Sequence, residues 1–138
     1  MSRNNKQKQY IFDIIRKKNV VVTPEELVRQ DFIHYLIDEL AYPKSKIAVE
    51  LGLKINDLSK RSDIVVFGSD FNPILAVECK APNVKIDQKV FDQLARYNLT
   101  LGVDYFILTN GKTTYCCKVN AKQKSYLHLD KIPFYIDL

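Results

Sequence analysis

Apolar residues recur with a helical period in the first third of the chain. Residues 23–26 (TPEE) predict a helix start, because Thr caps a helix, Pro fits its first turn and acids favour its N-terminus. Glu26 stands three residues after Thr23, which is the spacing of a capping box. The apolar positions that follow recur every four residues: Val28, Phe32, Leu36 and Leu40. They predict one buried face, ending at Tyr42-Pro43.

A second helix is predicted over residues 86–101. Its main apolar stripe consists of Val90, Leu94, Tyr97 and Leu101, with Phe91 and Ala95 beside it. Gln93 and Tyr97 stand one helical turn apart on the same face. An amide and a phenol there can contact a phosphate, or they can pack as a polar pair against the sheet. The residues alone leave both interpretations open.

The remaining apolar segments have the length and alternation of strands. The predicted strands are residues 10–15, 20–22, 46–55, 63–67, 74–80, 104–109 and 113–119. A turn is expected at residues 57–60, and residues 68–73 (GSDFNP) are a turn-rich connection. Asn110-Gly111 is the strongest short signal for a hairpin.

This order of elements predicts an α/β fold with a mixed sheet flanked by helices. A chain of 138 residues suits one domain. We expect a flexible basic leader over residues 1–9 and a single domain over residues 10–138. There is no apolar run long enough to span a membrane. Three cysteines, an odd number, favour a reducing compartment, so a cytoplasmic location is expected.

The net charge of +5 is concentrated at the N-terminus. Residues 1–18 carry six basic residues against Asp13 alone, whereas residues 19–138 carry fifteen of each sign. A basic arm that touches phosphates is one interpretation, and a solvated tail is the other. The globular part is not basic overall, so charge by itself does not indicate a nucleic-acid-binding protein.

Three ionisable residues stand where the strand pattern calls for apolar ones. Asp63 opens one predicted strand, and Glu78 and Lys80 lie two residues apart on a later one. In a strand such residues point to the same face. Buried acids and lysines are costly unless they pair or hold a metal.

That placement suggests phosphodiester hydrolysis. Carboxylates of Asp63 and Glu78 on adjacent strands can chelate Mg²⁺ or Mn²⁺, and the main-chain carbonyl of Cys79 can supply another ligand. The cation would polarise the phosphate and lower the pKa of a bound water. Lys80 can orient that water and stabilise charge on the phosphoryl oxygens. The alternative is an ordinary surface pair of Glu78 with Lys80, with Asp63 as a turn residue.

The spacing Asp63-(x14)-Glu78-x-Lys80 is the core of the PD-(D/E)xK nuclease superfamily. The wider pattern resembles the N-terminal nuclease domain of the restriction (R) subunit of type I restriction enzymes, with its restriction-endonuclease-like fold. The matching segments are residues 23–30 (TPEELVRQ), 61–67 (RSDIVVF), 77–82 (VECKAP), 93–98 (QLARYN) and 108–111 (LTNG). They span nearly the whole chain, from about residue 10 to about residue 120.

The resemblance implies roles for further residues. Gln93 and Tyr97 match a Q-x-x-x-Y motif that is associated with cleavage in the family. Glu26 is suggested as an additional catalytic acid, although Glu25 is an alternative and a capping Glu on a solvated helix face is the plainer interpretation. Candidate nucleic-acid contacts are Arg29, Gln30 and Lys85.

The resemblance also implies Mg²⁺-dependent cleavage of DNA in the context of restriction-modification subunits. The family enzyme depends on an attached ATP-driven motor, which this chain lacks, so its own substrate and regulation stay open. One alternative is a non-catalytic nucleic-acid- or partner-binding module that keeps the fold. Another is a structure-specific nuclease for junctions or flaps, which would favour a homodimer. DNA against RNA and sequence specificity are left open.

Overall fold

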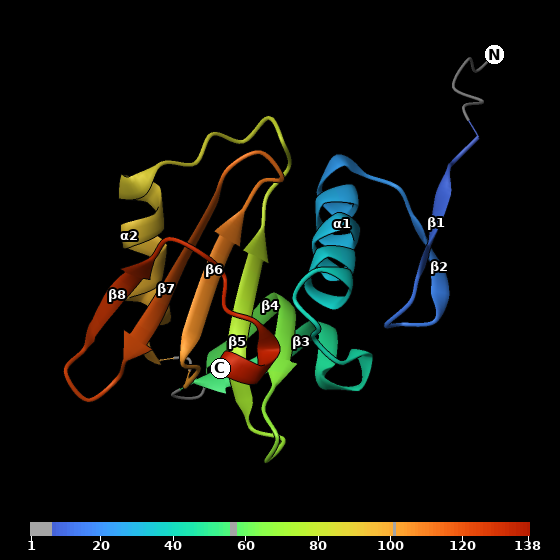
Figure 1. Ribbon diagram of the computed structural model, residues 1–138. Helices are drawn as coiled ribbons and strands as arrows, with labels where there is room; N and C mark the ends of the chain where they lie inside the picture. The colour runs from blue at the N-terminus through green and yellow to red at the C-terminus, as the bar shows by residue number, and fades with distance from the viewer. Residues whose placement is uncertain (1–6, 56–57, 101) are drawn as a thin grey trace.

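A computed structural model describes residues 7–55, 58–100 and 102–138 (Figure 1). The strands are β1 (Tyr10–Asp13), β2 (Lys18–Val21), β3 (Ile47–Ile55), β4 (Leu58–Phe67), β5 (Pro73–Cys79), β6 (Tyr105–Thr109), β7 (Thr114–Asn120) and β8 (Ser125–Leu129). The α-helices are α1 (Pro24–Asp38) and α2 (Gln88–Tyr97), and short 3-10 turns cover Lys44–Lys46, Asn98–Thr100 and Tyr135–Asp137.

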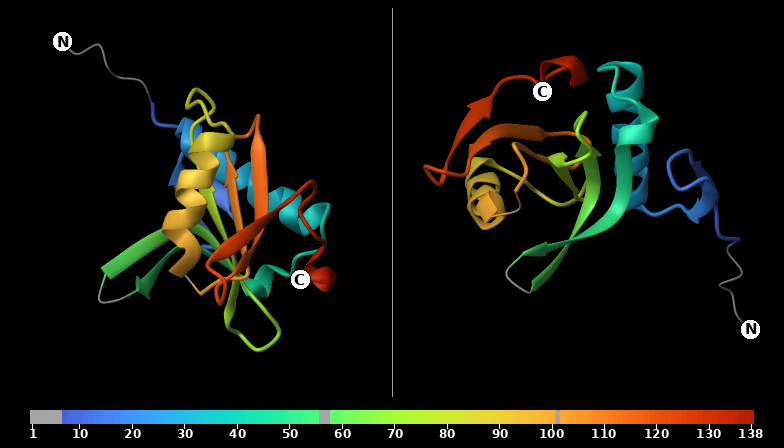
Figure 2. Two further views of the ribbon diagram at one scale, coloured as in Figure 1. Left: turned by 90° about the vertical axis from the view of Figure 1, so that its left-hand side faces the viewer. Right: turned by 90° about the horizontal axis from the view of Figure 1, so that it is seen from below.

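The main sheet has six strands in the order β3-β4-β5-β6-β7-β8. Only the β5–β6 pair is parallel, because α2 crosses over between these strands, whereas the other pairs are antiparallel hairpins. Strands β1 and β2 form a separate two-stranded sheet beside α1. Helices α1 and α2 cover opposite faces of the main sheet (Figure 2). The predicted α/β class with a mixed sheet flanked by helices is confirmed.

Alternating residues of β5 build a core on each face of the sheet. Leu75, Val77 and Cys79 pack into a cluster with α1, whereas Ala76 packs into a second cluster with α2. The α1 residues in the first cluster are Val28, Phe32, Ile33 and Leu36, so the predicted buried face of this helix is confirmed. Each fully buried aliphatic side chain of this kind stabilises the fold by roughly 2 kcal/mol.

The predicted apolar stripe of helix α2 is confirmed in part, because Val90 and Leu94 pack against the second core cluster, but the residues predicted beside it are the most buried. Phe91 and Ala95 are its buried residues, whereas Tyr97 is 65% exposed. The helix is also shorter than residues 86–101, because Asp87 caps its start through a hydrogen bond from the Val90 N–H. The expected role of Leu101 in the stripe lies outside the described residues.

Most strand ends differ from the predicted ones by one or two residues, β8 is additional, and β4 begins at Leu58, so that Asp63 lies within its strand and does not open it. Residues 44–46 form a 3-10 turn, so the predicted strand at 46–55 begins one residue later. Residues 58–60 belong to β4, so the predicted turn at 57–60 is wrong for them. Its first residue, together with residues 1–6 of the predicted leader, lies outside the described part of the chain. Strand β8 was not predicted, because its mostly exposed residues lack a clear apolar alternation.

The predicted hairpin at Asn110-Gly111 is confirmed. The Asn110 N–H donates to the Thr113 carbonyl, and Gly111 adopts a φ of +87°, a left-handed conformation that suits glycine. A Cβ at this position would come within 3.3 Å of the Val28 side chain of α1. The turn therefore lies directly against the helix. Among the described helices, none is long and apolar enough to cross a membrane.

Candidate active site

Asp63 lies where β4 separates from β5. The β4–β5 ladder includes the pair Ile64–Val77 and is not continued to Asp63 and Glu78. The Asp63 carboxylate occupies this point instead, and its Oδ2 accepts a hydrogen bond of 2.7 Å from the Cys79 N–H. The carboxylate therefore accepts the hydrogen bond of a backbone N–H that has no ladder partner where the two strands separate.

Glu78 and Lys80 follow on the same end of β5. Because Val77 and Cys79 pack toward α1, the alternation places Glu78 on the opposite side of the strand. Its Oε2 lies 3.0 Å from the Lys80 Nζ, and both side chains are partly exposed. This hydrogen bond raises the pKa of Lys80 above its ordinary value, against a smaller opposing effect of burial. Lys80 is thus a fixed positive charge at neutral pH, next to a carboxylate.

Arg29 of α1 connects this strand end to the helix. Its Nη2 donates to Asp63 Oδ1 at 2.8 Å, and its Nη1 donates to Glu26 Oε1 at 2.6 Å. Burial would lower the pKa of Arg29, but the hydrogen bond and charge of Asp63 and the charge of Glu26 raise it. Figure 1 shows why α1 can reach this strand end, since α1 begins at the end of the sheet where β5 finishes.

Arg16, in the turn of the β1–β2 hairpin, binds three carboxylates. Its Nε donates to Asp13 at 2.7 Å, its Nη2 contacts both oxygens of Glu26 at 3.2 Å, and its Nη1 donates to Glu50 at 3.1 Å. Gln30 closes the network by donating to Glu26 and Asp13. A continuous chain of hydrogen bonds therefore runs from the N-terminal hairpin through α1 to Asp63.

Glu50 is a further acid of this network that the sequence did not reveal. It stands on β3 between the pairs Val49–Ile64 and Leu51–Ser62, which places it opposite Asp63. Its φ of +56° is left-handed, a conformation that costs a non-glycine residue about 1–2 kcal/mol. In the sequence Glu50 is simply the polar member of an alternating strand, so nothing marked it. The role of Arg16 was equally hidden, because it was counted with the basic leader.

The two acids at the start of α1, Glu25 and Glu26, lie in different environments. The Glu26 carboxylate is buried and faces Arg16, Arg29 and Gln30, whereas that of Glu25 is 49% exposed and lies 3.4 Å from Arg29. Thr23 caps the helix as predicted, since its Oγ1 accepts the Glu26 N–H. Glu26 is therefore not on a solvated helix face.

The candidate nucleic-acid contacts are divided between the interior and the surface. Arg29 and Gln30 are buried and directed at carboxylates, so in this conformation they offer no donor to a ligand in solvent. Lys85 is exposed in the connection between β5 and α2. Gln93 is exposed on α2, and within the described residues no hydrogen bond links it to Glu78 or Lys80.

The donor set suits a hard divalent cation. Asp63 and Glu78 offer carboxylate oxygens, the ligands that Mg²⁺ prefers. Burial raises the pKa of the Cys79 thiol, so this side chain stays protonated and adds no soft ligand. In the described ranges no three acidic, His or Cys side chains converge in ligating geometry. Arg29 and Lys80 hold the two carboxylates instead, so a cation would compete with them.

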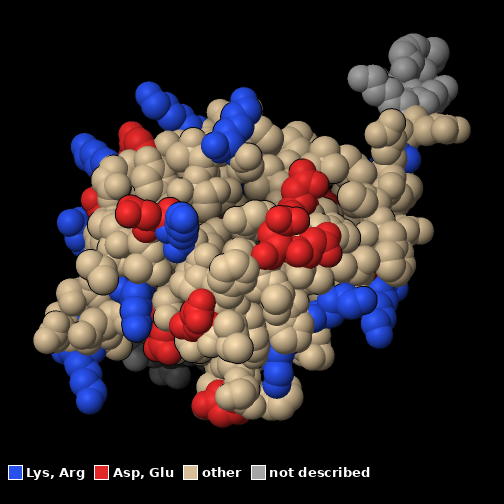
Figure 3. Space-filling model, viewed as in Figure 1, with Lys and Arg blue, Asp and Glu red and all other residues tan. Residues whose placement is uncertain are grey.

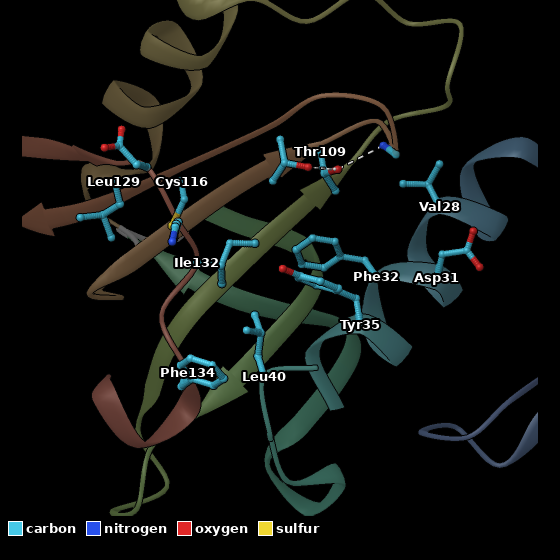
Figure 4. Close-up of a pocket in the computed structure, with 14 residues that line it drawn as sticks. Val28, Asp31, Phe32, Tyr35, Leu40, Thr109, Cys116, Leu129, Ile132 and Phe134 are labelled. Atoms are coloured by element: carbon cyan, nitrogen blue, oxygen red, sulfur yellow. Dashed lines mark hydrogen bonds between the residues drawn. The ribbon is translucent and has the colours of Figure 1, made fainter. Parts of the chain in front are cut away.

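A hollow of about 700 Å³ lies elsewhere, between α1, the sheet and the segment after β8 (Figure 4). Its apolar lining includes Val28, Phe32, Tyr35, Leu40, Leu129, Ile132 and Phe134. Asp63, Glu78 and Lys80 do not line it. The candidate catalytic residues therefore belong to the open strand end and not to this hollow.

The ion network predicts an acid-sensitive stability that depends on Asp13. Burial would raise the pKa of this fully buried carboxyl, but hydrogen bonds from Arg16, Gln30 and Ile15 outweigh it and lower the pKa. A lowered pKa stabilises the fold above the unfolded value of 3.8, and that contribution is lost as pH falls through the folded value. We expect Asp13→Asn to reduce the free energy of unfolding by about 2–4 kcal/mol at pH 7.

Urea denaturation at a series of pH values measures this effect. The difference between wild type and Asp13→Asn should shrink as the pH falls below 3.8. Asp104→Asn, which changes an exposed carboxylate, is the control and should match the wild type at pH 7. A destabilisation by Asp13→Asn that is the same at every pH would contradict the expectation.

Known proteins resemble this chain in sequence and in fold. The family model of the type I restriction enzyme R protein N terminus matches residues 24–133. A solved structure described as a fragment of a predicted HsdR subunit of a type I restriction enzyme, from Vibrio vulnificus YJ016, is 20% identical, with a TM-score of 0.56. It covers 83% of this chain, whereas this chain spans only 24% of that one.

A second solved structure is described as a predicted nuclease of the DUF820 group from Anabaena variabilis ATCC 29413. It is 15% identical with a TM-score of 0.54, and the match covers 88% of this chain and 82% of the length of that structure. No curated protein matches the chain. At such identities the two structures support the fold alone, whereas the family model spans most of the sequence. The chain belongs to the family of type I restriction enzyme R protein N-terminal domains and has a nuclease-like fold.

Proposed function

We propose that this chain is a metal-dependent deoxyribonuclease of the PD-(D/E)xK type. The observation that carries the proposal lies at the end of β5, where the Asp63 carboxylate accepts the Cys79 N–H and the residues on either side of Cys79, Glu78 and Lys80, form an ion pair. Paired carboxylates with a neighbouring ammonium suit phosphodiester hydrolysis. Asp63, Glu78 and the Cys79 carbonyl would hold Mg²⁺ or Mn²⁺, which would polarise the phosphate and acidify a bound water.

Lys80 has the clearest role among the chain's own groups. The hydrogen bond to Glu78 raises the pKa of Lys80 and favours its charged form, so we assign it the role of a positive donor. Its Nζ can donate to the attacking water and to a phosphoryl oxygen. Charge that builds up on the phosphate would then be stabilised by a positive group already in position.

We expect the substrate to be held through its backbone. No element of the described structure presents a row of side chains suited to base edges, so we propose recognition through the phosphate backbone. Gln93 and Tyr97 of α2 would support the site from the side of the sheet that Glu78 faces. Glu26 would act from α1 through Arg29 rather than through a direct contact with substrate, given its present hydrogen bonds.

The direct test is a cleavage assay on supercoiled plasmid and on single-stranded DNA with Mg²⁺ or Mn²⁺. We expect nicking that requires the cation and stops on addition of EDTA. An RNA strand of the same sequence serves as the comparison for substrate class. A folded chain that cuts none of these substrates with either cation would leave the nuclease proposal without support.

Arg29 provides a more specific prediction about the metal site. Its guanidinium holds Asp63 Oδ1, so it competes with a divalent cation for that oxygen. We expect Arg29→Met to bind Mn²⁺ at least about tenfold more tightly, because a like charge beside the site is removed. The same change should destabilise the fold by roughly 3 kcal/mol, since Glu26 and Asp63 lose a buried partner.

Isothermal calorimetry of Mn²⁺ binding, together with urea denaturation, checks both expectations. Arg29→Lys keeps a positive charge and should bind the cation nearly as weakly as the wild type. Arg96→Met changes an exposed arginine of α2 and serves as the control. Weaker Mn²⁺ binding by Arg29→Met would show that Arg29 organises the ligands instead of competing with the cation.

One observation favours a second candidate, a non-catalytic module that keeps the nuclease fold. Both oxygens of Asp63 are already engaged, by Arg29 and by the Cys79 N–H, so the carboxylate has a structural role without any metal. Such a module would work with separate restriction-modification subunits. This chain spans 24% of the HsdR fragment, so such subunits would be other polypeptides or other domains. Metal binding without cleavage would favour this candidate.

A further inference from the structure

The β1–β2 hairpin is a separate element before α1. It precedes residue 24, where the family match begins, and forms its own two-stranded sheet. Figures 1 and 2 show it on the far side of α1 from the main sheet. Its position beside the start of α1 places it next to the candidate active site.

The inner side of the hairpin is firmly attached to the domain. Asp13 and Arg16 bind Glu26 and Gln30 of α1 through the ion network described above. Ile14 and Ile15 pack against the core cluster under α1. The hairpin is therefore held in one orientation, and what its other side presents is a fixed feature of the molecule.

The outer side exposes aromatic side chains in a row. Tyr10 and Phe12 alternate with Ile11 and the buried Asp13, so both point away from α1. They are 58% and 53% exposed, and Val21, which pairs with Tyr10, is 40% exposed. Neighbouring exposed apolar residues of this size are typical of a binding surface.

Exposed lysines lie at both ends of the hairpin. Lys17 and Lys18 lie at the turn end of the hairpin and Lys8 precedes β1, all three exposed. Within the described residues none of them forms an ion pair, and Asp13, the acid of this hairpin, is buried and bound to Arg16. In Figure 3 blue side chains lie at the lower end of the hairpin, whereas acidic ones lie over α1.

We infer that the hairpin is a docking element for unpaired nucleic-acid bases beside the active site. Tyr10 and Phe12 would stack on successive bases, while Lys8, Lys17 and Lys18 would bind the adjoining phosphates. Exposed rings with lysines at both ends of the same hairpin suit this ligand better than an apolar protein surface, which would leave the ammonium groups without partners. The inference rests on the proposed function only in taking DNA as the nucleic acid.

Fluorescence anisotropy with a labelled oligothymidylate and EDTA measures docking separately from cleavage. Tyr10→Ala with Phe12→Ala should weaken binding about tenfold to a hundredfold, because each stacked ring contributes severalfold or more. Lys17→Ala with Lys18→Ala should reduce the slope of log affinity against log salt by about 1.4, as two phosphate contacts on a single strand require. A blunt duplex of equal length should bind less tightly than the single strand.

The chain offers matched controls for both variants. Tyr35 and Phe134 are a second exposed Tyr and Phe, 43% and 51% exposed, so their double alanine variant should bind like the wild type. Lys122 and Lys124 lie in the β7–β8 turn, and Lys124 shares with Lys17 a left-handed φ near +50°. Alanine at these two lysines should leave the salt slope unchanged.

Several results would overturn the inference. Hairpin variants that bind the oligonucleotide as well as the wild type does would exclude docking there, even if the wild type cuts plasmid, so the proposed function would survive alone. Loss of self-association without loss of DNA binding would make the hairpin a protein interface. A wild-type protein that binds no oligonucleotide would also overturn the inference of a docking element. The cleavage assay would then test the proposed nuclease function by itself.

Discussion

Replacing Lys80 by Ala is expected to reduce DNA cleavage by about 10²–10⁴-fold, the range typical of a group that works on the proton or charge of the transition state. The side chain is 36% exposed and pairs with Glu78, so the fold should lose no more than about 1 kcal/mol. Divalent cation binding should persist or tighten, because Glu78 loses a competing positive charge. Plasmid cleavage rates and calorimetry, measured side by side, separate the two effects.

The control for Lys80 is Lys131→Ala, which removes an exposed lysine from the segment after β8. It should cut at the wild-type rate. A Lys80→Ala variant that cuts normally would remove this residue from the mechanism.

Replacing Asp63 by Asn is expected to abolish both cation binding and cleavage. Loss of a residue that only supports a metal ligand lowers metal affinity by up to roughly a hundredfold. Because Asp63 would be a direct ligand, the affinity for Mn²⁺ should fall by more than that. The fold should also lose about 2–3 kcal/mol, because the Asn amide cannot replace the charged partner of Arg29. The amide oxygen can still accept the Cys79 N–H, so the strand end should remain in place.

Asp104→Asn is the matched control for Asp63. This exposed carboxylate lies just before β6, and because β5 and β6 are parallel it stands at the opposite end of the sheet from Cys79. It should bind Mn²⁺ and cut as the wild type does. Wild-type Mn²⁺ affinity in Asp63→Asn would show that Asp63 is not a ligand of the metal.

The elements with strong local signals could be predicted from the sequence. The TPEE start of α1 and its buried stripe follow from capping and periodicity, and the Asn110-Gly111 hairpin follows from turn chemistry. Asp63, Glu78 and Lys80 were visible because they interrupt apolar strands. These features depend on near neighbours along the chain, so a single sequence contains them.

The parts that could not be predicted depend on contacts between distant segments. Arg16 and Glu26 are ten residues apart, and Arg16 and Glu50 thirty-four, so no local pattern links them. The left-handed φ of Glu50 has no sequence signal, because its neighbours form an ordinary strand. Tyr97 lies on the predicted apolar stripe but is exposed, because Phe91 and Ala95 face the sheet instead.

The most direct measurement is calorimetric titration of the wild-type chain with Mn²⁺, run beside a plasmid nicking assay on the same preparation. A metal-dependent nuclease centred on Asp63, Glu78 and Lys80 predicts saturable binding and cation-dependent nicking, with both lost in Asp63→Asn and only nicking lost in Lys80→Ala. A folded wild type that neither binds the cation nor nicks the plasmid would contradict it.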